Sequence, residues 1–316
     1  MIDFRYHLVS IVAIFLALAT GVVVGGVALD ASRVHDLQQQ AASAQRQRDG
    51  LRADHTHDQR QVSADTALVA AITPRLTAGA LHGLTVSVVL APGASDAEQA
   101  AAMHIVAQGG GVLAATVRLA PALAVPAQSD LVDGVTNRVV PGGTSLPAGT
   151  AAARAAAVLA AALTGRPGTG AAGPPLDSSQ ALSVLQAYTE AKLLTLPGPA
   201  GPAGAPAFTP AGTVLLVLPA AGASDKGTQA FDTALAGDLT QRGADTVLAA
   251  PTGSLPAALI SPPMPRISTV DGIETPQGQL IAVLTLAAAG HGHPGNYGAS
   301  TGAIPPMPSA APVSQH

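Results

Sequence analysis

The hydrophobic pattern divides the chain into an apolar segment of membrane length, a polar helical segment and a region of alternating strands and helices. The apolar segment, residues 8–29 (LVSIVAIFLALATGVVVGGVAL), is 22 residues long and carries no charge. About 20 apolar residues of helix are enough to cross the hydrocarbon core of a bilayer. The pattern therefore predicts that residues 1–29 form a membrane-anchor helix. A signal peptide cleaved after Ala19 is the alternative, although the apolar run continues for ten more residues beyond it.

Small residues recur every four positions in this apolar segment, at Ala13, Ala17, Gly21 and Gly25. This spacing places them on one face of a helix, where two membrane helices can approach each other closely. We therefore expect the anchor to support a homo-oligomer. The alternative is that alanine and glycine, which are abundant in this chain, fall at this spacing by chance.

A polar segment rich in Gln, Arg and Asp follows the anchor. Its heptad a and d positions form a seam that is apolar up to Ala44 and more polar beyond it. These positions are Val34, Leu37, Ala41, Ala44, Arg48, Leu51, His55, Asp58 and Val62. We predict a juxtamembrane helix over residues 30–75 that continues the small-residue stripe as a short parallel coiled coil. A solvated single helix is the alternative.

Beyond residue 80 the order of a short strand, a turn, a helix and a second strand occurs twice. Strand-like runs at 84–90 and 213–218 are each followed by the tetrad Gly-Ala-Ser-Asp, at 93–96 and 222–225. A strand, a crossover helix and a second strand form a unit that pairs its strands in parallel. The sequence therefore predicts an α/β fold, with a duplicated Rossmann-like parallel domain after the membrane and juxtamembrane helices.

The two α/β halves are expected at residues 80–195 and 213–300, joined by a Pro- and Gly-rich spacer at 196–212. A Pro- and Ala-rich tail over 301–316 is expected to be disordered. Further strands are predicted at 112–117, 245–248 and 267–270, and further helices at 148–163 and 177–194. The run 277–289 is predicted to be either an apolar helix or a buried strand.

Composition excludes several classes of protein. Aromatic residues make up 2% of the chain, charged residues 11%, and the formal net charge is −4, so neither stacking platforms nor a basic surface is available for nucleic acid. The absence of cysteine excludes disulfides, thiolate metal sites and cysteine catalysis. The nucleophile elbow Gly-x-Ser-x-Gly and the phosphate-binding loop are both missing. We expect neither a nucleic-acid partner nor enzymatic activity.

Asp96 and Asp225 recur at equivalent positions of the two tetrads, which raises the question of a catalytic pair. Serine and aspartate are favoured at the start of a helix, and Glu98 stands three residues after Ser95, as in a capping box. Helix capping therefore accounts for the recurrence without chemistry, and we favour it over the catalytic interpretation.

The candidate metal ligands are two His-x-His pairs, His55 with His57 and His291 with His293. Residues two apart on a helix point in different directions, so the first pair is expected on a solvated face. The second pair lies in a Gly- and Pro-rich segment, where a tight loop can bring both imidazoles together near Tyr297. Imidazole is a suitable ligand for Cu(II), zinc and nickel. His291 and His293 are therefore the candidate metal site, and a Gly-rich structural turn is the interpretation that we favour for this segment.

Two segments resemble the actinobacterial copper transport family MctB. The N-terminus MIDFRYHLVSIVAIFLALATGVVVGG matches the family's head motif at Arg5, His7, Val9, Ser10 and residues 15–18. The segment STVDGIETPQGQLIAVLTLAAAGHGHPGNYG matches its tail motif at residues 269–271 and at Gly292, Gly295, Tyr297 and Gly298. The resemblance implies an envelope protein that limits intracellular copper, described as an outer-membrane channel or efflux component, with copper as the transported ion and no resident cofactor.

We therefore expect a component of copper efflux that one membrane span holds in the cell envelope. The alternative is a membrane-anchored scaffold that binds other envelope proteins and affects copper only indirectly.

Overall fold

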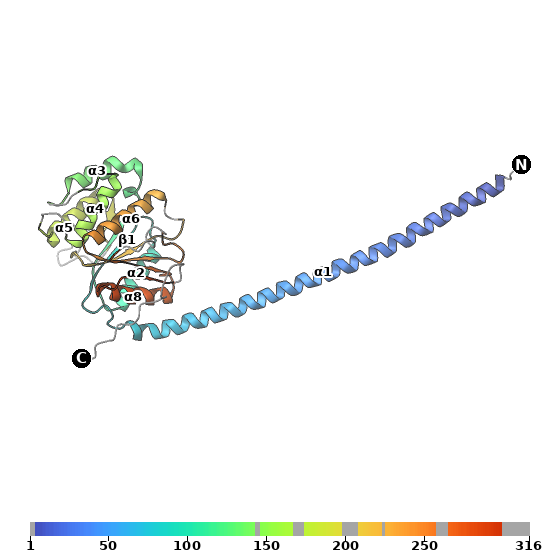
Figure 1. Ribbon diagram of the computed structural model, residues 1–316, viewed down its shortest axis with the longest axis horizontal. Helices are drawn as coiled ribbons and strands as arrows, with labels where there is room; N and C mark the ends of the chain where they lie inside the picture. The colour runs from blue at the N-terminus through green and yellow to red at the C-terminus, as the bar shows by residue number, and fades with distance from the viewer. Residues whose placement is uncertain are drawn as a thin grey trace. The chain divides into compact units, whose positions relative to one another are not determined.

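The computed structural model describes residues 4–142, 146–166, 174–197, 208–222, 225–256 and 265–298. The chain forms two compact units, Met1–Asp65 and Thr66–His316. Helix α1 (Phe4–Thr77) makes up the described part of the first unit and ends within the second, which is an α/β domain (Figure 1).

The apolar helix expected at the N-terminus is present. Within α1, Tyr6–Val24 is a 19-residue stretch with a mean hydropathy of 2.5 and no buried residue, and its length and composition suffice to cross a membrane. The helix continues without a break through the polar residues that follow. The sequence predicted an anchor and a separate juxtamembrane helix, and both lie in this one continuous helix.

The α/β domain contains one sheet, and the described strands follow the order β3-β2-β1-β4-β5-β6-β7. Their bounds are β1 Thr85–Leu90, β2 Val112–Leu119, β3 Leu194–Thr195, β4 Thr213–Val217, β5 Asp245–Ala250, β6 Ile267–Asp271 and β7 Asn296–Tyr297. Neighbouring strands pair in parallel, except that β2 and β3 are antiparallel. The predicted α/β class with a mostly parallel sheet is therefore confirmed.

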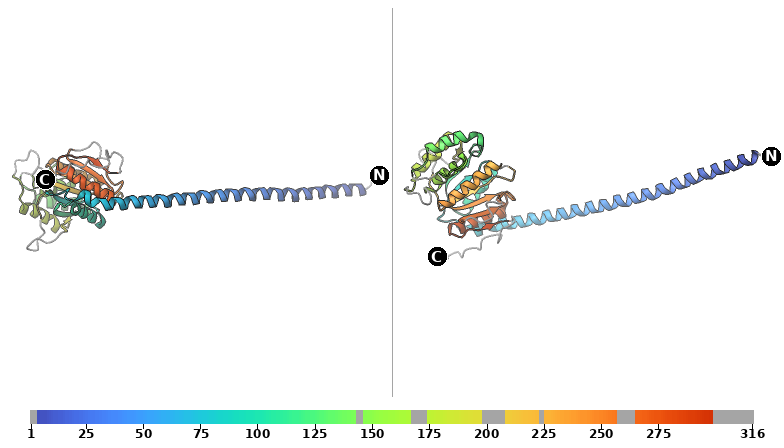
Figure 2. Two further views of the ribbon diagram at one scale, coloured as in Figure 1. Left: turned by 90° about the horizontal axis from the view of Figure 1, so that it is seen from below. Right: turned by 45° about the horizontal axis from the view of Figure 1, so that its top comes forward.

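Helices cover both faces of this sheet (Figures 1 and 2). One face carries α2 (Asp96–Gln108) and α8 (Pro276–Gly290). The other carries α3 (Ser129–Arg138), α4 (Ala151–Thr164), α5 (Ser178–Glu190) and α6 (Lys226–Gln241), together with the short 3-10 turns Pro121–Leu123 and Pro126–Gln128.

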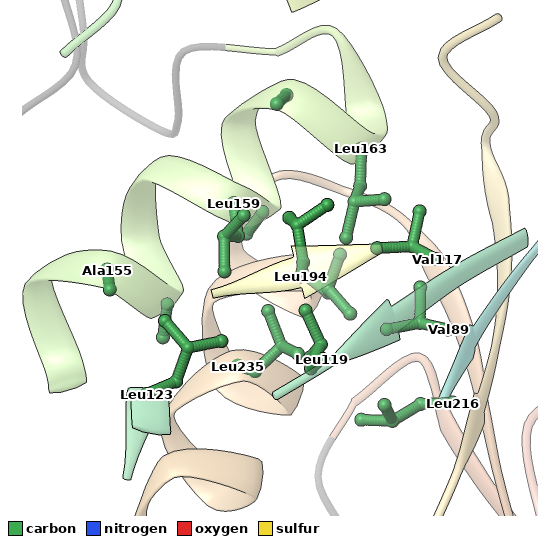
Figure 3. Close-up of a cluster of buried hydrophobic side chains, with 14 of the residues drawn as sticks. Val89, Val117, Leu119, Leu123, Ala155, Leu159, Leu163, Leu194, Leu216 and Leu235 are labelled. Carbon is green, nitrogen blue, oxygen red and sulfur yellow. The ribbon is translucent and has the colours of Figure 1, made fainter. Parts of the chain in front are cut away.

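The central strands send alternate side chains into two separate cores. On β4, Val214 and Leu216 belong to the core beneath α3–α6, whereas Leu215 and Val217 belong to the core beneath α2 and α8. A strand that is buried on both faces is apolar along its whole length, which is why residues 213–218 form a continuous apolar run. Figure 3 shows the first core, where leucines of α4 point toward Leu216 and its neighbours on the sheet.

Helix α4, with the sequence AAARAAAVLAAALT, forms much of the first core, and 11 of its 14 residues are buried. It packs against α3, α5 and α6. Alanine combines a high helix propensity with a one-methyl side chain, so this helix can lie close to its neighbours. Its charged residue, Arg154, donates from Nε to Asp133 Oδ1 of α3 at 2.9 Å, where both side chains remain partly exposed.

Two β-α-β units, β1-α2-β2 and β4-α6-β5, advance in opposite directions from the centre of the sheet. Crossovers between parallel strands are almost always right-handed, so units that advance in opposite directions place their helices on opposite faces. This agrees with the positions of α2 and α6. The loops that follow β1 and β4 therefore leave the sheet beside each other at its carboxyl edge, where α/β proteins commonly bind ligands.

The predicted helix at 177–194 is too long, because α5 ends at Glu190 and Leu194 begins the edge strand β3. Lys192 adopts a left-handed conformation with φ of 59°, and the Leu193 N–H donates to the Tyr188 carbonyl at 2.9 Å. This arrangement ends the helix and turns the chain back, so β3 pairs antiparallel to β2 instead of in parallel.

Other predictions have mixed outcomes. The run 277–289, for which both a helix and a strand were considered, is the helix α8, and α3 was not predicted. Parts of the predicted spacer and tail, residues 198–207 and 299–316, lie outside the described residues.

The start of α8 is in direct backbone contact with the turn that follows β6. A Cβ atom at Gly278 would overlap the carbonyl group of Gly272. Thr275, the N-cap residue, accepts from the Gly278 N–H at 3.0 Å and donates to the Gly272 carbonyl at 2.8 Å. Glycine at 278 therefore allows the turn to fold onto the helix.

We expect Gly278→Ala to lower the free energy of unfolding by at least about 2 kcal/mol, because the added methyl group would force two backbone segments apart. The matched control is Gly237→Ala in α6, where an added Cβ would have no neighbour within 4 Å. That substitution should raise the stability by about 0.5–1 kcal/mol, through helix propensity. Urea unfolding followed by circular dichroism measures both, and effects of the same sign would contradict this account.

Candidate functional site

His291 and His293 lie in the turn that ends α8. The N–H groups of both residues donate to the carbonyl of Ala288, at 3.1 and 2.9 Å. Both side chains are exposed. Within the described ranges, no three His, Asp or Glu side chains are grouped so that they could hold a metal ion. The turn therefore fixes the backbone of the two histidines, and among these residues no third ligand stands beside them.

The residues of the tail motif fold the segment after α8 against β6. The Gly295 N–H donates to Ser268 Oγ at 3.2 Å, and a Cβ atom at Gly295 would overlap the phenol ring of Tyr297. Gly298 has a φ of +124°, and a Cβ atom there would overlap the buried carboxylate of Asp271. Tyr297, expected near the histidine pair, thus packs at the edge of the sheet in β7.

The two Gly-Ala-Ser-Asp tetrads cap helices, as predicted. Ser95 is the N-cap of α2, and its hydroxyl accepts from the Glu98 N–H while the Glu98 carboxylate accepts from the Ser95 N–H. In the second tetrad Asp225 is the N-cap of α6, one position later, and accepts from the Thr228 N–H at 2.7 Å. This hydrogen bond to the backbone lowers the pKa of Asp225.

Asp96 forms an ion pair with Arg118, whose Nη2 lies 2.7 Å from its carboxylate. Arg118 also donates to the Ala94 carbonyl and to Gln99 Oε1, each at 2.6 Å. Since Arg118 is near the end of β2, these bonds hold the loop after β1 against the neighbouring strand. The aspartates of the two tetrads therefore each have a structural role within their own loop.

A cavity of about 210 Å³ lies at the carboxyl edge of the sheet, beside the second tetrad. Its walls come from the loop after β4, the loop after β5 and helix α6: Leu218–Gly222, Gly253–Pro256, Gln229 and Asp232. The two loops are joined by a hydrogen bond of 2.8 Å from the Ala221 N–H to Ser254 Oγ. The β5 loop is also fixed to the turn that follows β6, because Thr252 donates from its hydroxyl to Glu274 Oε1 at 2.6 Å.

Asp232 is a buried acid in the wall of this cavity. Asp232 is 2% exposed, and its Oδ1 atom has no hydrogen-bond partner among the described residues. Burial raises the pKa of Asp232 to about 7. Because this pKa lies close to neutral pH, a small change in the surroundings of the carboxyl group decides whether it is charged.

Asp232 was not among the residues predicted from the sequence, although the helix pattern contains a signal for it. Phe231, Leu235 and Leu239 recur at helical spacing and are buried, and Asp232 lies on the same face. An acid on the apolar face of an amphipathic helix is unusual enough to be a candidate for function. What the pattern does not contain is the cavity, which two separate loops create.

Comparison with known proteins agrees with the resemblance. The family model described as "Copper transport outer membrane protein, MctB" matches residues 1–308. A protein of Mycobacterium bovis named Copper transporter MctB is 30% identical over 316 residues, which cover 96% of this chain and 98% of that protein. Proteins of the same name from two Mycobacterium tuberculosis strains, CDC 1551 and H37Rv, match with the same identity and coverage.

We expect Asp232→Asn to remove a pH dependence of stability. The folded chain keeps this proton up to a pH of about 7, whereas an aspartate in an unfolded chain releases it near pH 4. The stability of the natural chain should therefore fall as the pH rises through this interval and remain level above it. The free energy of unfolding of Asp232→Asn should exceed that of the natural chain by an amount that grows over the same interval, to on the order of 2–4 kcal/mol.

Urea unfolding at several pH values between 4 and 8 measures this difference. Asp130→Asn, which removes an exposed carboxylate at the start of α3, serves as the control. If the stability difference between Asp232→Asn and the natural chain does not change with pH, Asp232 is not a buried ionisable group.

Proposed function

This chain belongs to the MctB family of copper transport outer membrane proteins, and on that premise we propose that it is a copper efflux component of the cell envelope that limits intracellular copper. The observation that carries the proposal is the extent of the match. The family model covers residues 1–308, and the mycobacterial copper transporters align over 98% of their length. The apolar helix and the α/β domain therefore both belong to the shared protein. The transported ion is copper, and the chain acts without enzymatic turnover.

The apolar stretch Tyr6–Val24 serves, in this proposal, as an uncleaved single-span anchor in the envelope. Its described side chains are exposed to solvent, so a bilayer would remove a large apolar surface from water. Cleavage after Ala19 would cut within the continuous helix α1. These two features support an anchor over a signal peptide.

Copper transport by this chain requires more than one copy or a partner protein, because a single membrane helix encloses no path. We propose a homo-oligomer in which the stripe Ala13, Ala17, Gly21 and Gly25 forms the contact between membrane helices. The coiled-coil seam predicted over residues 34–62 continues this contact in the same helix.

The α/β domain is proposed to be a duplicated Rossmann-like arrangement. The two β-α-β units support this proposal, because each begins with a central strand and continues through a capped Gly-Ala-Ser-Asp loop into a crossover helix. The antiparallel edge strand β3 has no counterpart in such a duplication.

His291 and His293 are the proposed copper contacts. Their exposed imidazoles stand two residues apart on a turn that backbone hydrogen bonds hold in place, and imidazole is a suitable ligand for Cu(II). Because the described residues provide only these two ligands, we propose that they contact a copper ion weakly while it passes and do not store it.

Cellular copper content tests the proposed function. Deletion of the gene should raise the copper content of cells grown with added copper, and the intact gene should restore it. Unchanged copper after deletion would overturn the efflux proposal and leave a membrane-anchored scaffold as the better explanation.

The same assay tests the copper contacts with matched double variants. His291→Ala/His293→Ala should restore export less well than the natural gene, because the proposed ligands are gone. His55→Ala/His57→Ala removes the other His-x-His pair, which is exposed on α1, and should restore it fully. Equal rescue by both double variants would remove His291 and His293 from the mechanism.

The proposed helix contact predicts a difference between two alanines in the membrane segment. Ala17→Leu should lower the dimer fraction of the full chain in detergent by about fivefold or more, because a bulky side chain separates helices packed through small residues. Ala19→Leu adds the same side chain about 200° away around the helix and should have little effect. Chemical crosslinking measures both, and equal dimer fractions would contradict a contact through the stripe.

A further inference from the structure

Asp232 requires an explanation that the fold does not provide. A buried polar atom without a partner lowers stability, and a charged one lowers it more. Oδ1 of Asp232 is such an atom: it is buried, and it has no hydrogen-bond partner among the described residues. Its helix neighbours Phe231 and Leu235 are buried in the apolar core. A carboxyl group kept at such a cost is typical of a site that binds something.

The surroundings of Asp232 have the form of a ligand site. The cavity lies at the carboxyl ends of β4 and β5, the edge of the sheet where α/β domains bind small molecules. Leu218 and Leu255 provide apolar walls, and Gln229 and Ser254 add polar groups. Because the Ser254 hydroxyl oxygen accepts from the Ala221 N–H, its own proton remains available to a further acceptor.

The charges around the cavity exclude two classes of ligand. Among the described residues that line it, one is an acid and none is basic, so no positive charge is present to hold an anion. The N-terminus of α6, which attracts anions in other α/β proteins, is already capped by the Asp225 carboxylate. A firmly held metal ion would need further ligands beside Asp232, and the described residues provide no group of three His, Asp or Glu side chains.

We propose that this cavity binds a small organic amine, whose ammonium group pairs with the Asp232 carboxylate. The positive charge of the ligand compensates the buried negative charge, so the carboxyl group becomes ionised and paired when the amine binds. The short carbon chain of the amine lies against Leu218 and Leu255. This binding site is separate from the proposed copper contacts and goes beyond copper transport.

Titration of n-propylamine into the full chain in detergent, followed by ligand-observed NMR, tests the proposal at pH 7. A ligand of this size is expected to bind with a Kd of about 1 mM. Asp232→Asn should weaken binding by at least about 30-fold, because the charge that pairs with the ammonium is lost. Asp238→Asn removes an acid of the same helix that does not line the cavity, and should change the Kd by less than about twofold.

Two probes of the same length separate a charge-specific site from an apolar hole. 1-Propanol and propionate should bind at least about tenfold more weakly than the amine, since neither carries a positive charge. Equal binding of 1-propanol, an unchanged Kd in Asp232→Asn, or no binding of the amine at 30 mM would each overturn the proposal. Detergent without protein is the blank, and the melting curve of Asp232→Asn shows that any loss of binding occurs in a folded protein.

Discussion

The fold depends on the requirement that a parallel sheet be covered on both faces. The backbone of such a sheet is satisfied internally, but its side chains emerge on two sides and both sets are apolar here. The central strand β4 illustrates this, because Leu215 and Leu216 belong to different cores. Two layers of helices follow from it.

The same requirement determines where chemistry can occur. Chain crossovers that cover both faces bring the loops after the central strands to one edge, and the cavity with Asp232 lies there. The histidine turn lies at the end of α8, outside that cavity, and the apolar stretch Tyr6–Val24 belongs to the other unit of the chain. The proposed anchor, the proposed copper contacts and the proposed amine site are therefore carried by different parts of the chain.

The sequence predicted the elements whose signal is local. The strand at 84–90 is a β-branched run, and the helix after it begins at a capping box between Ser95 and Glu98, so both could be located from neighbouring residues. The edge strand β3 could not, because its two residues are held by pairing with Arg118 and Leu119, which are distant in the sequence. Helix α3 lacks other local signals: it has only ten residues, Gly134 lies within it, and its N-cap residue Gln128 makes no capping hydrogen bond from its side chain. The same holds for the candidate sites: the spacing of His291 and His293 is visible in the sequence, whereas the cavity beside Asp232 depends on two loops that are distant in the sequence and are joined by Ala221 and Ser254.

Helix α4 has a consequence for how this domain can change over generations. Single-nucleotide changes of an alanine codon produce valine, threonine, serine, proline, aspartate, glutamate or glycine, and all but the last enlarge the side chain. A core of leucines is most often damaged by losing atoms, and partial collapse of the resulting hole limits the loss. A helix face of alanines is damaged by gaining atoms, because an added group must enter space that the side chains of α3, α5 and α6 already fill. We therefore expect that few single substitutions at the buried alanines of α4 are tolerated without a compensating change in a neighbouring helix.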